Sequence, residues 1–354
     1  MDHSLQVGMG MARGIDRKQV ILGLFCLATV CLLIADLAFG PVYLSVGDIM
    51  AAVAGDAAPV PQTIFSEIRA PRALLAITVG ASLALAGASL QGALRNPLAD
   101  PGLIGVSAGA AVGAVTIIVL GDVVFGDVAG PTSAARPFLL PLGAFIGGAL
   151  VTAFVFLVAA GPNRVSTSTL ILAGVAVNAI AGAFIGAMVY VSDDSQLREL
   201  TFWTMGSVGG AHWALVFPTL ALALPACALL LFRARALDLF QLGERAAFHS
   251  GLDVEREKIM IGLMTAMAVG AATAAAGPIG FIGLVAPHIA RLLTGPTHNF
   301  ILPSAALVGA ALTLAADLTV RSAAPPAEPP IGLATALIGG PFFLWLVMRS
   351  RRHD

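Results

Sequence analysis

Three arginines are the residues whose type and spacing most clearly suggest recognition chemistry. Arg69 and Arg72 stand three positions apart in "SEIRAPRALL", and Arg321 precedes "SAAPPAEPP". A guanidinium group presents a rigid set of donors that matches a carboxylate in a bidentate pair. The arginines either bind carboxylates of a partner protein or contact lipid headgroups at a membrane edge. Pro71 predicts a helix start here, where the helix dipole would disfavour positive side chains.

A second group of polar residues interrupts the apolar stretch "LQGALRNPLADPGLIGVSAGA", which runs from position 90 to 110. Pro97 and Pro101 predict the end of one helix and the start of the next. We expect Arg95, Asn96 and Asp100 to be solvent-exposed in a tight hairpin between the two helices.

A third candidate is the polar segment 233–258, "RARALDLFQLGERAAFHSGLDVEREK". Leu237, Phe240, Ala246 and Ala247 form an apolar stripe beside charged residues, which predicts a short surface helix. The segment is either a solvated amphipathic loop or a docking helix for a cytoplasmic partner.

Several kinds of chemistry have no support in the chain. The sequence lacks a G-x-x-x-x-G-K-[ST] phosphate loop, and neither of its lysines, Lys18 and Lys258, follows a glycine. His288 and Arg291 are spaced like a ligand pair, but no cysteine or carboxylate lies near them. We therefore expect no catalytic residues, no metal site and no cofactor, and any ATP must be bound by another chain.

The composition predicts a membrane protein. The chain of 354 residues is 58% hydrophobic and 11% charged, with a mean hydropathy of +0.92, whereas soluble domains carry about 25% charged residues. Ten apolar runs are long enough to cross a bilayer. They are 19–40, 72–94, 102–121, 137–160, 168–191, 212–232, 258–276, 279–294, 301–320 and 331–348.

Basic residues predict the orientation of these runs. With the N-terminus inside, the outer segments hold only Arg69, Arg72, Arg136, Arg198 and Arg321, and the cytoplasmic segments hold the other 14 of the 19 Lys and Arg residues. The expected domains are a cytoplasmic segment 1–18, a transmembrane domain 19–348 with a cytoplasmic segment 233–258, and a cytoplasmic tail 349–354. The first run is too long for a cleaved signal peptide, so we expect a retained helix.

A short internal similarity suggests a repeat. "GLIGVSA" at 102–108 and "GFIGLVA" at 280–286 share G-x-I-G-x-x-A. The predicted helices run in opposite directions, so the two segments either belong to an inverted repeat or are alike by chance. Six of the ten runs carry no ionisable residue in their middles, which weakens an ion-coupled mechanism.

The chain resembles the permease family of bacterial ATP-binding-cassette (ABC) importers for iron-siderophores, haem and cobalamin. The resemblance spans about 45–352 and rests on "RAPRALLAITVGASLALAGASLQGALRNPLADPGLIGVSAGA", "LILAGVAVNAI", "FWTMGSVGGAHW", "GPIGFIGLVAPHIARLLTGPTHNF" and "AADLTVRSAAPPAEPPIGLATALIGGPFFLWLVMR". It implies an all-α homodimer of ten-helix subunits in the bacterial inner membrane. Two ATP-binding subunits would dock on the cytoplasmic side and a periplasmic binding protein on the other, with no nucleic-acid partner.

The resemblance also implies residue roles. Arg69, Arg72 and Arg321 would meet glutamates of the binding protein. A cytoplasmic gate would comprise Asn96, Pro97, Leu98, Ser166, Thr167 and Ser168. The family pattern "LG-x-x-x-A-x-x-LG", here "LGERAAFHSGL" with Ser250 in place of Leu, would contact the ATPase through Gly243, Glu244, Ala246, Ala247, His249 and Gly251.

The segment "YVSDDSQLRELTFWTMGSVGG" is similar to the haem-importing branch, which favours haem as the substrate. An uncharged path lined by Gly, Ala and Met would also accept a ferric siderophore or cobalamin. An ion-coupled secondary transporter is the more remote alternative.

Overall fold

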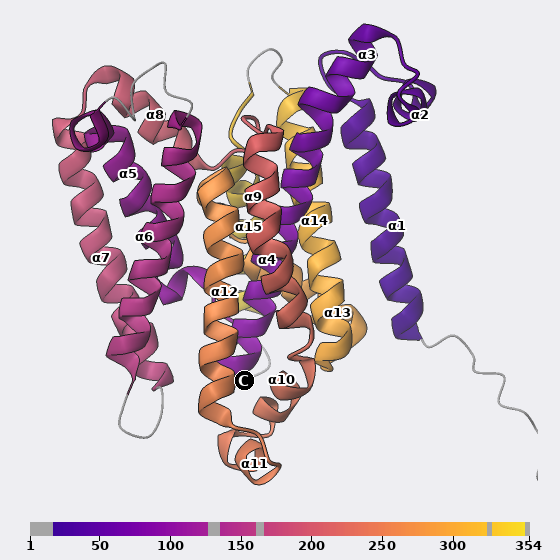
Figure 1. The fold of residues 1–354 in the computed structure, drawn as a ribbon. Coiled ribbons are helices and arrows are strands. Elements are labelled where there is room, and N and C mark those ends of the chain that lie inside the picture. The colour runs from indigo at the N-terminus through magenta and orange to yellow at the C-terminus, as the bar shows by residue number, and fades with distance from the viewer. Residues whose placement is uncertain (1–16, 127–134, 161–165, 324–327, 351–354) are drawn as a thin grey trace, which may run out of the picture.

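The computed structural model describes residues 17–126, 135–160, 166–323 and 328–350, and its regular elements there are all helices (Figure 1). Most of the predicted N-terminal segment 1–18 and of the tail 349–354 lies outside these ranges. Figure 1 places α2 and α3 at the upper end of the bundle and α10 and α11 at its lower end.

Each of the ten predicted apolar runs coincides with a helix. Eight of these are long and apolar enough to cross a membrane: α1 (Arg17–Ala38), α4 (Ala70–Leu94), α5 (Val106–Phe125), α6 (Arg136–Ala159), α7 (Thr167–Val191), α9 (Trp213–Leu231), α12 (Val254–Ala276) and α14 (His298–Ala323). The other two are α13 (Ile282–Thr294) and α15 (Ile331–Ser350), whose apolar stretches are shorter.

Shorter elements connect these helices. At the upper end are α2 (Val46–Ala54), α3 (Pro59–Thr63), a π-helical turn η1 (Ile64–Arg69) and α8 (Asp194–Met205). A 3₁₀ turn η2 (Pro101–Ile104) precedes α5. At the lower end, the predicted surface helix forms as two helices, α10 (Ala234–Gln241) and α11 (Glu244–His249).

The centre of the bundle is α4, which is buried along most of its length and packs against α9, α12, α13 and α14. Small residues permit this close approach. A side chain at Gly80 would collide with the backbone of Gly309 on α14, and one at Gly87 with Gly283 on α13. Glycine at positions 80 and 87 of α4 is therefore a packing requirement.

Two further groups flank the core in Figure 1. Helices α5, α6 and α7 stand together on one side, and α5 meets α6 where Gly109 and Gly113 face Gly147 and Gly143. On the opposite side, α1 packs mainly on α14.

The predicted helix start at Pro71 is wrong. Helical backbone runs without a break from Pro59 to Leu94, over 36 residues, with one π turn at Ile64–Arg69. Arg69 and Arg72 therefore lie in the body of a helix, and the argument from an unfavourable helix dipole does not apply to them. A π turn inserts one extra residue and is frequent at functional sites.

The expected hairpin after α4 is only partly exposed. Of the three polar residues expected to be exposed, Arg95 is exposed, whereas Asn96 and Asp100 are partly buried. Ala99 and Pro101 are buried, and η2 packs among α4, α5, α6, α7 and α12. The third apolar helix consequently begins at Val106 instead of 102.

The two similar heptapeptides adopt different local conformations. In the first, a 3₁₀ turn precedes Gly105, which has a φ of 80°, and α5 begins one residue later. In the second, Phe281 has a φ of 68°, and α13 begins at once with Ile282. The residues that the two heptapeptides share therefore do not adopt the same local backbone conformation.

Candidate functional site

The upper end of the bundle holds a cluster of three arginines and three carboxylates, which we call the upper ion cluster. It comprises Arg69, Arg72, Arg321, Asp36, Asp317 and Glu328. The arginines are only 3%, 4% and 4% exposed. Their three positive charges are balanced by the three carboxylates.

Arg72 lies between two carboxylates of different character. Its Nε and Nη2 donate to Asp317 of α14 at 2.9 Å each, and both side chains are buried. Its Nη1 donates at 2.6 Å to Glu328, whose side chain is 43% exposed. Breaking a buried pair by removing one partner costs about 3–5 kcal/mol, whereas an exposed pair contributes about 0.2–1 kcal/mol. The inner contact is thus fixed and the outer one is weak.

Arg321 ties α14 to α1. Its Nη2 donates to both the side chain and the carbonyl oxygen of Asp36 at 2.7 Å, and its Nε lies 4.0 Å from Asp317. The second carboxylate oxygen of Asp36 is buried without a hydrogen-bond partner. Arg321 therefore holds the upper end of α1 against the core.

Arg69 caps the end of α1. Its guanidinium donates to the carbonyl oxygens of Leu37, Ala38 and Val42. The last carbonyls of a helix have no partner within the helix and attract cations. The π turn that contains Arg69 is fixed in turn by the indole of Trp213, which donates to the carbonyl of Ser66 at 2.8 Å.

The sequence analysis missed the acidic half of this cluster. Asp36 and Asp317 are the single acidic residues of the predicted runs 19–40 and 301–320. A charged residue within an apolar run usually has a specific partner, so this pattern was a usable signal. Glu328 had no comparable signal, because it lies in the Pro-rich segment before α15.

The lower end carries the segment 233–258. Leu237 and Phe240 of α10 are fully buried, and Asp238 accepts hydrogen bonds from the backbone and ring nitrogens of His298 at 2.9 and 2.6 Å. Helix α10 is therefore fixed against the start of α14.

Two ion pairs join this segment to α12. Lys258 Nζ donates to Glu244 at 2.6 Å, and Arg233 Nη1 donates to Glu257 at 2.8 Å. Gly243, between α10 and α11, has a φ of 103°, a backbone conformation that disfavours any residue with a side chain.

The predicted coupling residues divide into two groups. Ala246, His249 and Gly251 are exposed and Glu244 is half-buried, whereas Ala247 is fully buried and supports α11 from within. The sequence analysis missed the most exposed apolar side chains of this segment, Leu242 and Phe248; Phe248 is 67% exposed.

The predicted gate residues lie just after the lower end of α4 and at the lower end of α7, where that helix begins. Helix α4 ends in a Schellman motif, because Asn96 N donates to the carbonyl of Gln91 and Arg95, with a φ of 52°, takes the left-handed position. Asn96 Oδ1 then accepts from Leu98 N at 2.9 Å, which closes a tight turn around Pro97.

The other predicted gate segment begins α7. Ser166 is its N-cap and accepts from Thr169 N at 3.3 Å, and the hydroxyls of Ser166 and Ser168 lie 3.1 Å apart. The side chain of Thr167 lies outside the described part of the chain.

A direct contact links the coupling segment to the helix that ends at the hairpin. Gln241 Nε2, at the end of α10, donates to the carbonyl of Gly92 in the last turn of α4 at 3.2 Å. A side chain at Gly92 would meet the His298 ring 2.7 Å away, so α10, α14 and α4 converge at this point.

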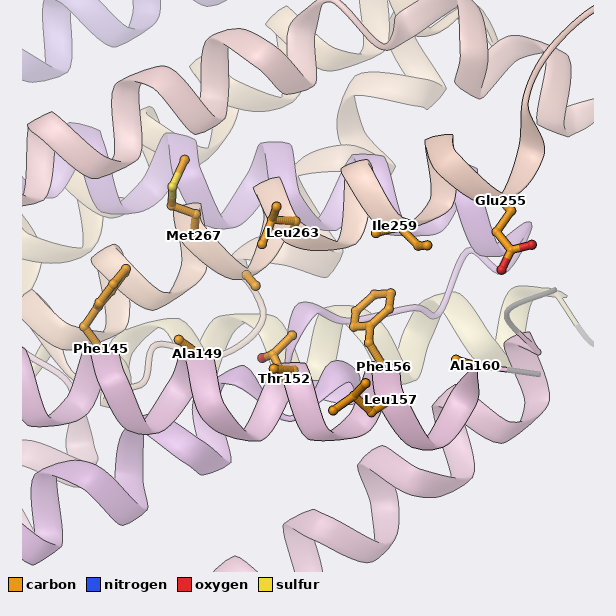
Figure 2. Close-up of a pocket in the computed structure, with 12 residues that line it drawn as sticks. Phe145, Ala149, Thr152, Phe156, Leu157, Ala160, Glu255, Ile259, Leu263 and Met267 are labelled. Carbon is orange, nitrogen blue, oxygen red and sulfur yellow. The ribbon is translucent and has the colours of Figure 1, made fainter. Parts of the chain in front are cut away.

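A groove of about 510 Å³ runs between α6 and α12. Figure 2 shows its lining side chains, which are apolar apart from the hydroxyl of Thr152 and the carboxylate of Glu255 at one end. No basic residue lines it, so it offers no complementary charge to an anionic ligand. Among the described residues, no group of three or more His, Cys, Asp or Glu could hold a metal ion.

Comparisons with known proteins place the chain among transport permeases. A profile of the FecCD transport family matches residues 27–349. The hemin transport system permease of Yersinia pestis is 44% identical over 299 residues, covering 82% of this chain and 84% of that protein. A cobalamin import permease of Halobacterium salinarum is 43% identical over 81% of this chain and 73% of its own length. A vitamin B12 import permease of Vibrio cholerae is 37% identical over 95% of this chain and 94% of its own.

The fold agrees with these sequence matches. A solved metal-chelate type ABC transporter in an inward-facing conformation superimposes with a TM-score of 0.82 and 33% identity, over 93% of this chain and 99% of that one. The chain therefore belongs to the FecCD transport family, as a multi-pass membrane permease of an ABC importer that leaves ATP hydrolysis to a separate subunit.

Proposed function

We propose that this permease moves haem (hemin) from the periplasm to the cytoplasm across the bacterial inner membrane. The observation that carries this proposal is the 44% identity to a hemin permease over most of both chains. The second candidate is the same machinery importing cobalamin, which the relatives at 43% and 37% identity favour, or a ferric siderophore.

The proposed topology has ten membrane crossings, both termini in the cytoplasm and the upper end of Figure 1 in the periplasm. The excess of basic residues in the predicted cytoplasmic segments supports this orientation. A homodimer with the substrate path along its axis completes the architecture. Within each subunit, the segments 102–108 and 280–286 would belong to an inverted repeat.

On the periplasmic side, a substrate-binding protein docks over the upper ion cluster. Arg69, Arg72 and Arg321 come from two distant parts of the sequence and meet at one end of the bundle, which supports a shared site. Carboxylates of the binding protein are the matching chemistry for guanidinium groups.

On the cytoplasmic side, each of two ATP-binding subunits docks on α10 and α11 of one permease copy. Gly243, Glu244, Ala246, His249 and Gly251 contribute to this surface. Ala247 supports it from inside the chain, and the exposed ring of Phe248 is the apolar anchor.

The gate comprises Asn96, Pro97 and Leu98 together with Ser166, Thr167 and Ser168, facing their counterparts in the second copy. The hydrogen bond from Gln241 to Gly92 supplies the mechanical link, because a displacement of α10 acts directly on the last turn of α4. A stiff hairpin follows that turn, so a movement of the helix end reaches the gate residues.

The test is reconstitution of the permease into liposomes with its ATPase and its substrate-binding protein. Hemin, cobalamin and a ferric siderophore are offered separately, and uptake is measured with and without internal ATP. We expect ATP-dependent uptake of hemin only when all three components are present. Uptake of cobalamin or the siderophore instead would reassign the substrate. Uptake driven by a proton gradient without the ATPase would overturn the importer mechanism.

A further inference from the structure

Among the three cluster arginines, only Arg72 is paired with a carboxylate whose side chain is partly exposed. Its Nε and Nη2 are occupied by buried Asp317, and its Nη1 is occupied by the half-exposed Glu328. The guanidinium therefore has two donors bound to a buried carboxylate and one outer donor bound to a partly exposed carboxylate.

Arg69 and Arg321 have no such exchangeable contact in the described residues. Arg69 donates to backbone carbonyls around the end of α1, and Arg321 donates to the carbonyl and carboxylate of fully buried Asp36. A docking carboxylate would have to displace backbone carbonyls to reach Arg69, and the buried acceptors of Asp36 to reach Arg321.

Exposed backbone without a side chain adjoins the contact between Arg72 and Glu328. The exposed Gly209 lies beside the pair, and a side chain there would stand 3.1 Å from Glu328 Oε2 and 3.9 Å from Arg72 Nη1. Glu328 covers the outer donor of Arg72. Because Gly209 has no side chain, only backbone lies beside this contact.

We infer that Glu328 is a placeholder carboxylate, which occupies Arg72 Nη1 until a carboxylate of the docking protein replaces it. This inference rests on the proposed docking of a periplasmic binding protein at the upper ion cluster. Arg72 is the residue that exchanges partners, and Arg69 and Arg321 position the site by fixing α1.

A placeholder solves a physical problem at this position. A buried guanidinium donor without an acceptor is strongly unfavourable, and the site must exist without its partner before docking and after release. Glu328 supplies the missing acceptor in the free protein. Because it competes for the same donor, it also weakens the docked complex and favours release.

The experiment measures binding of the substrate-binding protein that supports uptake in the reconstituted system. Permease–ATPase complexes in nanodiscs are compared by surface plasmon resonance at low and high salt. Glu328→Gln removes the competing charge, and Glu328→Asp keeps the charge but shortens the side chain by one methylene. Glu199→Gln, an exposed carboxylate of α8 at the same end, controls for a general change in surface charge.

We expect Glu328→Gln to raise affinity by about 2- to 5-fold, the range for loss of one competing exposed ion pair. Glu328→Asp should also raise affinity, because competition depends on the contact, whereas Glu199→Gln should leave it unchanged. Equal gains from Glu328→Gln and Glu199→Gln, with none from Glu328→Asp, would reduce the effect to long-range charge and overturn the inference. Unchanged or weaker binding by Glu328→Gln would also overturn it.

Failure of the proposed function is distinguishable from failure of this inference. If the wild-type complex binds no substrate-binding protein and its ATPase activity is not stimulated, the proposed docking is wrong. The proposed role of Glu328 is then wrong as well. If the wild type binds and only the variants behave otherwise, the docking proposal stands and the placeholder alone is wrong.

Discussion

The two ends of the bundle, which we propose as docking sites, differ in how they treat charged and apolar side chains. At the upper end, charged side chains are buried and mutually neutralised, so that Arg72 and Arg321 lock α1, α4 and α14 together. At the lower end, buried Lys258 pairs with the partly exposed Glu244, much as Arg72 pairs with Glu328, but large apolar side chains such as Phe248 face outward.

The difference follows from the cost of an unoccupied site. A buried guanidinium without a carboxylate is costly, so the upper end carries its own acceptors. A phenyl ring in water costs only the hydrophobic free energy that docking will recover, so the lower end leaves it uncovered. Under the proposed functions, the upper site would exchange contacts when a partner docks, whereas the lower site would add them.

The largest effect should come from Asp317→Asn. The change removes the carboxylate that holds Arg72 by two donors and lies 4.0 Å from Arg321, so we expect a loss of about 3–5 kcal/mol of stability. The thermal unfolding midpoint in nanodiscs measures it. Asp56→Asn, an exposed carboxylate near the same end, is the control. Equal midpoints for Asp317→Asn and the wild type would make the upper ion cluster dispensable for folding.

The second effect tests the lower end. Phe248→Ala should weaken ATPase binding by about 2 kcal/mol or more, roughly 30-fold, because buried aromatic anchors dominate interfaces. The unfolding midpoint of the permease should not change, since the ring is exposed. Copurification and titration of the ATPase measure the loss. The matched variant Phe202→Ala, exposed on α8, should bind normally, and equal binding by both variants would remove Phe248 from the interface.

A smaller effect should separate ATPase binding from the coupling of ATP hydrolysis to substrate transport. Gln241→Leu removes the hydrogen bond to Gly92 while leaving α11 in place. One lost hydrogen bond is worth about 0.5–1.5 kcal/mol, so we expect substrate moved per ATP to fall about 2- to 10-fold while ATPase binding persists. Gln196→Leu, which loses a similar bond to Val119 at the upper end, is the control. Unaltered coupling in Gln241→Leu would show that α10 and α4 communicate by another route.

The smallest effect concerns pH. Burial raises the pKa of Asp100 above its ordinary value of 3.8, against the opposing hydrogen bond from Gly102. A raised carboxyl pKa means that the fold favours the protonated form. The stability that the fold gains from the protonated Asp100 side chain is fully present below about pH 3.8 and is lost as the pH rises through the raised pKa of Asp100. Asp100→Asn should therefore stabilise the protein near neutral pH, by less than about 1 kcal/mol.

Unfolding midpoints at about pH 4 and about pH 8 would show this as a smaller pH dependence in Asp100→Asn than in the wild type. A larger dependence in the variant would mean that the ionised carboxylate is the favoured form in the fold.

Much of the fold was predictable, because hydrocarbon thickness and hydropathy together set helix number and length. The ten apolar runs became ten apolar helices, most with ends shifted by a few residues, and the amphipathic segment 233–258 formed α10, α11 and the start of α12. The errors concerned helix ends, because prolines in the sequence were taken to mark where a helix begins or where the chain is exposed. Pro71 fits inside a helix because a π turn precedes it, and η2 is buried because five helices surround it.

For the sites, the sequence by itself determined which residues could form contacts, and only the tertiary structure decided which contacts they form. The three arginines stand out from composition and topology alone. Their partners do not, since Arg72 and Asp317 are 245 positions apart and Arg321 and Asp36 are 285 apart. Packing of α1 and α4 against α14 brings these groups together, and burial makes each pair obligatory, because a charge in the core must be neutralised by whichever opposite charge the fold places beside it.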